Sequence, residues 1–178
     1  MKIAHTLVPL VLALLLLPPL PAQKQKREPL TEAQADKIAE AGINPDARVG
    51  IYTKFIEEHA ETIRGLARRT TSDARSRRLN GELEDFTALM DELDENLDTY
   101  GDRKADMRKS LKTLNDAVPR WQQMLRALAG EPGFDLARKE AIESSEDLLG
   151  DAKRLLAEQT AYFSEHKDEA GQDRWEPK

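Results

Sequence analysis

The sequence predicts an all-α protein, an up-down-up-down antiparallel four-helix bundle with a short N-terminal helix. Glycine, proline and capping residues occur only at wide intervals, and they divide the sequence into long segments of helical periodicity. Charged residues make up 34% of the chain and aromatic residues 5%, which suits long helices with solvated outer faces. Apolar residues also recur at steps of three and four, the spacing of one helical stripe. This stripe consists of Leu79, Leu83, Phe86, Met90, Leu93, Leu97, Tyr100, Met107, Leu111, Leu114, Val118, Trp121, Leu125 and Leu128.

The first 22 residues have the pattern of a secretory signal peptide. Lys2 supplies a positive n-region, residues 7–17 form an apolar core, and the segment 18–22 ends in a small residue suited to cleavage. The alternative is an uncleaved anchor, but the apolar run 3–17 is shorter than the ~20 residues needed to cross a bilayer. We therefore expect a periplasmic or secreted protein that is not an integral membrane protein after cleavage.

Composition narrows the classes of function. The chain has no cysteine, so it cannot form disulfides, thiolate metal sites or the thioether links of c-type haem. Its formal net charge of −6 opposes general binding to nucleic acid and electrostatic docking on an anionic membrane. We expect partners among proteins or components of the cell envelope, and no nucleic acid.

Residues 23–44 are expected to form a flexible leader and a short helix. Thr31 and Gln34 match a capping box, in which the threonine oxygen accepts from the N3 amide while the glutamine reaches back to the cap. A helix over 32–41 follows, and Gly42 ends it. Its apolar face is small, so this helix must dock on a larger surface.

Residues 45–168 are expected to form the helical bundle. Asn44 provides a cap and Pro45 an N1 proline, and the first long helix extends from there to about Arg69. The same signals predict helices over 73–100, 102–129 and 135–168, and a disordered tail over 169–178.

Two interpretations of the junction at Gly101 remain open. Glycine often ends helices, which favours a turn between two packed helices. One continuous helix over 73–129 is the alternative and would make a three-helix arrangement, because a helical glycine costs only ~1 kcal/mol. Lys104 distinguishes the two, since in a continuous helix it would lie between apolar layers. A turn would bring opposite charges together: Asp98 with Lys104, Asp94 with Arg108, and Asp91 with Lys112.

We find no motif for a metal, a cofactor or catalysis, and we expect no enzymatic activity. Di-iron bundles use Glu-x-x-His pairs, but Ile56 precedes His59 and Phe163 precedes His166 at the i−3 position. Non-covalent haem between a histidine and a methionine remains conceivable. Ser144 lies on an acidic helical surface with no histidine nearby in sequence to act as its base.

His59 falls on the apolar stripe of the first long helix. The expected interpretation is a core histidine, hydrogen-bonded across the bundle to Tyr100 or Tyr162. A metal ligand or catalytic base at this position is the less favoured alternative.

Six arginines surround the first turn between long helices, with Asp73 the only acid among them. Cations at the C-terminal end of a helix suit its dipole, which is a structural explanation. The functional alternative is an anion or partner site at one end of the bundle. The candidate site residues are Arg64, Arg68, Arg69, Arg75, Arg77 and Arg78.

These observations predict an exported, soluble helical-bundle protein that acts by protein or envelope interaction, in binding, scaffolding or a chaperone-like role. It would be a monomer or a dimer. The alternative function is a bundle that binds a small ligand or cofactor, such as haem, a metal or a lipid.

Overall fold

The structure is a computed structural model that describes residues 28–171. The predicted signal peptide and the end of the predicted tail lie outside these residues. The described part is all-helical, as predicted, and contains no strand. None of its helices is both long and apolar enough to cross a membrane. Five α-helices pack together: α2 (Glu32–Glu40), α3 (Pro45–Ala67), α4 (Asp73–Asp102), α5 (Arg108–Ala127) and α6 (Asp135–Glu165), followed by the 3₁₀ turn η2 (Lys167–Glu169).

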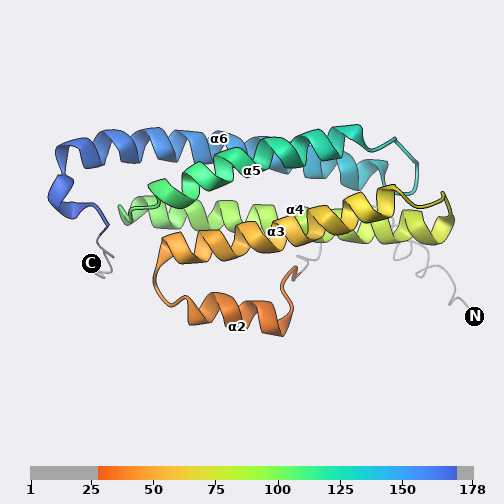
Figure 1. Ribbon diagram of the computed structural model, residues 1–178, viewed down its shortest axis with the longest axis horizontal. Helices are drawn as coiled ribbons and strands as arrows, with labels where there is room; N and C mark the ends of the chain where they lie inside the picture. Colours follow the sequence, from red (N-terminus) through yellow and green to blue (C-terminus); the bar gives the residue numbers. More distant parts are fainter. Residues whose placement is uncertain (1–27, 172–178) are drawn as a thin grey trace, which may run out of the picture.

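Long helices that follow each other in the sequence are not always neighbours in space. Figure 1 shows α3 and α5 running one way and α4 and α6 the other. α3 packs against α4 and α5, and α6 packs against the same two helices. α4 and α5 therefore lie across the core from each other. Their side chains meet in the centre, where the rings of Phe86 and Trp121 pack edge to face with centroids 5.8 Å apart.

Every residue of the stripe predicted over 79–128 is buried. Burying a large apolar side chain contributes about 1.5–3 kcal/mol, so this stripe supplies much of the driving force for folding. The core also contains Phe134, 1% exposed just before α6, which the helical spacing did not predict.

The chain turns between α4 and α5, so the continuous helix over 73–129 is wrong. Lys104 is exposed in the turn and takes the left-handed conformation, with φ 57°. Gly101 lies inside α4 rather than ending it. A Cβ there would come within 2.8 Å of Leu155 Cδ2, so this glycine lets α6 approach closely.

The charge pairs expected between the helices flanking this turn do not form. Asp98 accepts a bond of 3.2 Å from Arg154 of α6, and Arg108 binds Asp106 at 2.8 Å. The physical reason is that α4 and α5 lie across the core from each other. The neighbours of α4 are α3 and α6, so its acids do not reach the cations of α5.

A buried glutamine holds the α4–α5 turn against α6. Gln159 Oε1 accepts from the Met107 amide at 2.9 Å, and its Nε2 donates to the Ala105 carbonyl at 2.8 Å. Asp46 of α3 accepts from the Ser110 amide at 2.9 Å. Because Met107 gives α5 no side-chain cap, these tertiary bonds satisfy amides that a local cap would otherwise serve.

The two ends of the described chain pack on the bundle. The capping box of Thr31 and Gln34 is present, which confirms that prediction, and α2 buries Ile38 against α3. Residues 169–171 fall in the tail predicted to be disordered, yet they are placed in the structure. The Gly171 amide donates to Asp106 at 3.0 Å.

Replacing Gln159 with leucine should lower the free energy of unfolding by about 2–4 kcal/mol, because it leaves a buried amide and a buried carbonyl without partners. Urea denaturation followed by circular dichroism measures this loss. Gln123→Leu, at an exposed position of α5, is the control and should change stability by less than about 0.5 kcal/mol. Equal effects of the two variants would contradict the role given to Gln159.

Candidate functional site

The six candidate arginines lie around the junction of α3 and α4, but they have different surroundings. Arg75 forms an ion pair with Glu131 inside the fold, and Arg64 forms ion pairs with acids of its own helix. The other members are exposed, and no ion pair joins them to an acid within the described residues: Arg68, Arg69, Arg77 and Arg78.

Arg75 joins three segments of the chain and is only 9% exposed. Its Nη1 donates to both carboxylate oxygens of Glu131, at 2.8 and 3.1 Å, in the α5–α6 loop. Its Nε donates to the Leu66 carbonyl at 3.0 Å, at the C-terminal end of α3. The hydrogen bond from Arg75 lowers the pKa of Glu131, against a smaller opposing effect of burial. Arg75 is therefore unavailable to a ligand.

Arg64 is held by two acids of α3, Glu57 at 3.0 Å and Glu61 at 2.6 Å. Glu57 also accepts from the indole of Trp121 at 2.6 Å. Burial raises the pKa of Glu57, but the bonds from Trp121 and Arg64 and the charges of Arg64 and Arg120 outweigh it, so the pKa is lowered. The Arg64 guanidinium is thus fixed in position and partly neutralised.

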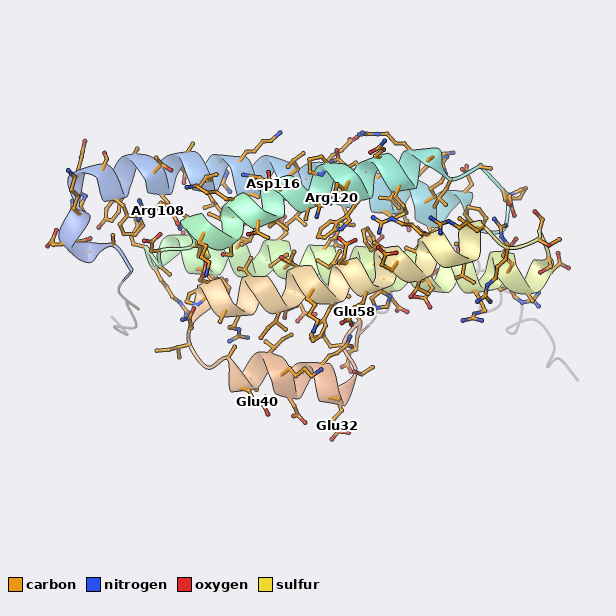
Figure 2. All side chains as sticks on the ribbon, in the orientation of Figure 1. Glu32, Glu40, Glu58, Arg108, Asp116 and Arg120 are labelled. Atoms are coloured by element: carbon orange, nitrogen blue, oxygen red, sulfur yellow. The ribbon has the colours of Figure 1, made fainter. Side chains whose placement is uncertain are left out.

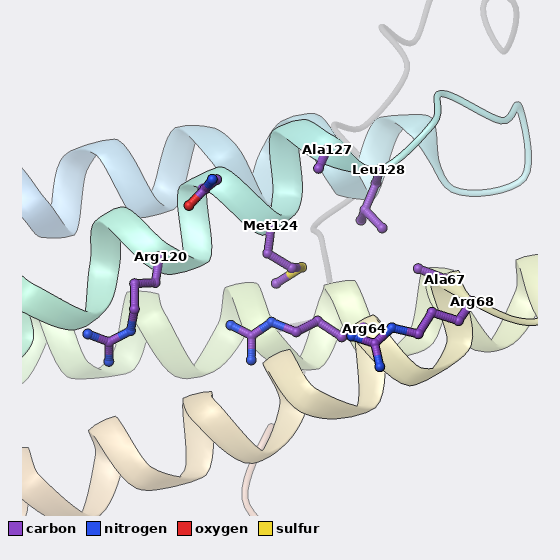
Figure 3. A pocket seen from close by; sticks show the side chains of 8 residues that line it. Arg64, Ala67, Arg68, Arg120, Met124, Ala127 and Leu128 are labelled. Atoms are coloured by element: carbon purple, nitrogen blue, oxygen red, sulfur yellow. The ribbon is translucent and has the colours of Figure 1, made fainter.

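A groove of about 480 Å³ lies between the C-terminal halves of α3 and α5 (Figure 3). Met124 and Leu128 of the α5 side point toward α3 and form part of an apolar floor. Arg64, Arg68 and Arg120 border it. The lining residues are Arg64, Ala67, Arg68, Arg120, Gln123, Met124, Ala127 and Leu128.

Arg120 was not among the sequence candidates. Figure 2 places it on α5, one turn after Asp116, and its Nη1 donates to the Asp116 carbonyl at 2.8 Å. The spacing of Arg120 and Met124 shows that they share a face of α5. Periodicity alone does not show that this face lies beside α3, so the sequence could not reveal the groove.

His59 is not the core histidine expected from the sequence. Its side chain is 20% exposed, and Nδ1 lies 2.9 Å from Glu82 Oε2. It sits at the edge of the α3–α4 contact, where Glu82 is the nearest partner, whereas Tyr100 bonds Asn96. His166 Nδ1 lies 2.9 Å from the Tyr162 carbonyl. Within residues 28–171 there is no cluster of three or more histidines or acids arranged to hold a metal ion.

The α4–α6 side of the bundle is acidic. Burial, followed by the charges of four nearby aspartates, raises the pKa of Asp94 to about 6. Arg154 compensates some of this charge through Asp98 and Asp151. Like charges across two helices oppose an incoming anion, so an anionic ligand is not expected beside these aspartates. The aspartates nearest Asp94 are Asp151, Asp98, Asp147 and Asp91.

Comparisons with protein-family models, with curated proteins and with solved structures found no match to this chain.

Replacing Asp94 with asparagine should stabilise the protein at pH 7.5 by about 1 kcal/mol, a value reduced for solvent screening. The folded-state pKa of Asp94 lies above its usual value of 3.8, so the ionised folded state carries a penalty. This penalty is full above about pH 6 and disappears as the pH falls below about 4.

Urea denaturation at pH 7.5 and at pH 4 measures the difference between the two proteins. The control is Asp36→Asn, which changes an exposed acid of α2 and should have little effect at either pH. A gain from Asp94→Asn that is equal at both pH values would contradict the electrostatic explanation.

Proposed function

We propose that this protein is an exported, soluble up-down-up-down helical bundle that acts by binding, as an adaptor or scaffold for an acidic protein partner. One observation carries the proposal. Arg68, Arg69, Arg77 and Arg78 are exposed at one end of the bundle, and no acid among the described residues pairs with them.

Free guanidinium groups are well suited to this role. An arginine presents a planar set of donors that can bind a carboxylate with two parallel hydrogen bonds. The protein as a whole is acidic, with a formal net charge of −6, so an anionic partner is attracted to this end rather than to the whole surface. The same net charge disfavours docking on an anionic membrane, which supports a protein partner.

The surroundings of the polar side chains support binding over catalysis. Ser144 donates its hydroxyl hydrogen to Asp91 at 2.6 Å, and the buried Ser145 donates to the Ile142 carbonyl at 2.6 Å. The two histidines among residues 28–171, His59 and His166, lie beside Glu82 and the Tyr162 carbonyl. A bundle that binds haem or a metal is therefore the second candidate and not the first.

Changing Arg68, Arg69, Arg77 and Arg78 together to glutamine should weaken binding of poly-L-glutamate by at least about tenfold at low salt, because it removes the free cations. Fluorescence anisotropy measures the affinity, and circular dichroism verifies the fold. The matched control replaces four exposed lysines elsewhere with glutamine: Lys54, Lys109, Lys112 and Lys153.

Equal losses in the two quadruple variants would mean that only net charge matters, and would refute the proposal. Vesicles containing phosphatidylglycerol are tested in parallel. Stronger arginine-dependent binding to these vesicles than to poly-L-glutamate would replace the protein partner with a membrane surface.

A further inference from the structure

The α3–α5 groove lies between larger side chains of the two helices. Arg64 and Arg68 are four residues apart and line one face of α3, while Arg120 and Met124 do the same on α5. Ala67 and Ala127 also line the groove, and their small side chains leave room in it.

The apolar floor favours an occupant that brings apolar side chains of its own. Met124 and Leu128 are each 9% exposed and are held by the core beneath them. The groove is open to solvent rather than enclosed. An alkyl chain laid in it would keep one flank in water and bury little of its surface. An amphipathic helix places apolar residues on the floor and keeps a polar face toward solvent.

The charges beside the floor determine which helix would fit. Arg120 of α5 and Arg68, the C-cap of α3, lie toward opposite ends of the groove, with Arg64 between them (Figure 3). Among the described residues neither Arg68 nor Arg120 forms an ion pair with an acid, although the charge of Arg120 contributes to the lowered pKa of Glu57. A helix with acids beside its apolar stripe would meet a cation near each end of the groove. A helix with basic flanks would be repelled.

We propose that the α3–α5 groove is a docking site for an acidic amphipathic helix of a partner protein. This inference rests on the proposed function, since it assumes an acidic protein partner. It goes further by assigning the contact to the groove rather than to the whole arginine-rich end. It also brings in Arg120, which the proposed function does not use.

The test uses two designed fluorescent peptides that differ only in charge. Both carry leucines at helical spacing, and the flanking positions are glutamate in one and lysine in the other. The purified protein, beginning after the predicted signal peptide, should bind the glutamate peptide and not the lysine peptide in fluorescence anisotropy. Failure to bind the glutamate peptide, with poly-L-glutamate still bound, would overturn the groove inference and leave the proposed function standing.

Three variants locate the binding. Arg68→Gln combined with Arg120→Gln removes two of the three arginine charges that border the groove, and Ala127→Trp fills the groove at an exposed position without changing charge. Each of these two variants should weaken binding of the glutamate peptide by at least about tenfold. Arg77→Gln combined with Arg78→Gln removes the same charge outside the groove and should change affinity by less than about twofold.

Other results would overturn the inference. Equal weakening by the groove and control variants would make the whole arginine-rich end the contact surface. An unchanged affinity in the Ala127→Trp variant would place the peptide elsewhere. Binding of dodecanoate that Ala127→Trp abolishes, without peptide binding, would assign the groove to an amphiphile. Self-association abolished by Ala127→Trp in sedimentation velocity would assign it to a second copy of the chain.

Discussion

The ion pair between Arg75 and Glu131 fixes one end of the bundle, the end at which the exposed arginines lie. Arg75 lies in the first turn of α4. Its guanidinium donates to the last carbonyls of α3 and to Glu131 in the loop that connects α5 to α6. Ser76 adds a bond of 3.0 Å to the same carboxylate. A single guanidinium thus satisfies the end of one helix and joins it to a loop residue 56 positions after Arg75 in the sequence. Charge-assisted bonds to a largely buried cation are costly to break, so this end is well defined.

At the opposite end of the bundle, contacts between α6 and the α4–α5 turn help to determine which helices are neighbours. Gln159 holds the α4–α5 turn, and Gly101 allows Leu155 of α6 to lie close to α4. With α4 and α5 across the core from each other, α3 and α5 become neighbours and form the groove. The same arrangement places α4 beside α6 and brings their aspartates together. The groove and the cluster of aspartates therefore both follow from which helices are neighbours, and not from the order of the residues alone.

The sequence predicted the features that depend on local spacing. The buried stripe over 79–128, the capping box at Thr31 and the turn near Gly101 follow from periodicity and from residues a few positions apart. Features that depend on pairs of helices were missed. A stripe shows which face of a helix is buried but not against which helix, so the expected pairing of Asp98 with Lys104 failed and the groove went unseen.

The candidate arginines show the same limit. The six arginines lie close together in sequence, and nothing local distinguishes Arg75 from Arg77 or Arg78. Only the position of Glu131 separates a cation that belongs to the fold from cations that are exposed. His59 was assigned to the core because it falls on an apolar stripe. In the structure it lies at the edge of that stripe, where it contacts Glu82 instead.

The central claim is that Arg75 acts in the fold while the exposed arginines act in binding. A double-mutant cycle of Arg75→Gln and Glu131→Gln, measured as free energies of unfolding, tests it most directly. The account predicts that each single variant loses nearly as much stability as the double variant, and that poly-L-glutamate binding by the folded protein is unchanged. Additive losses, or a loss of binding with unchanged stability, would contradict it.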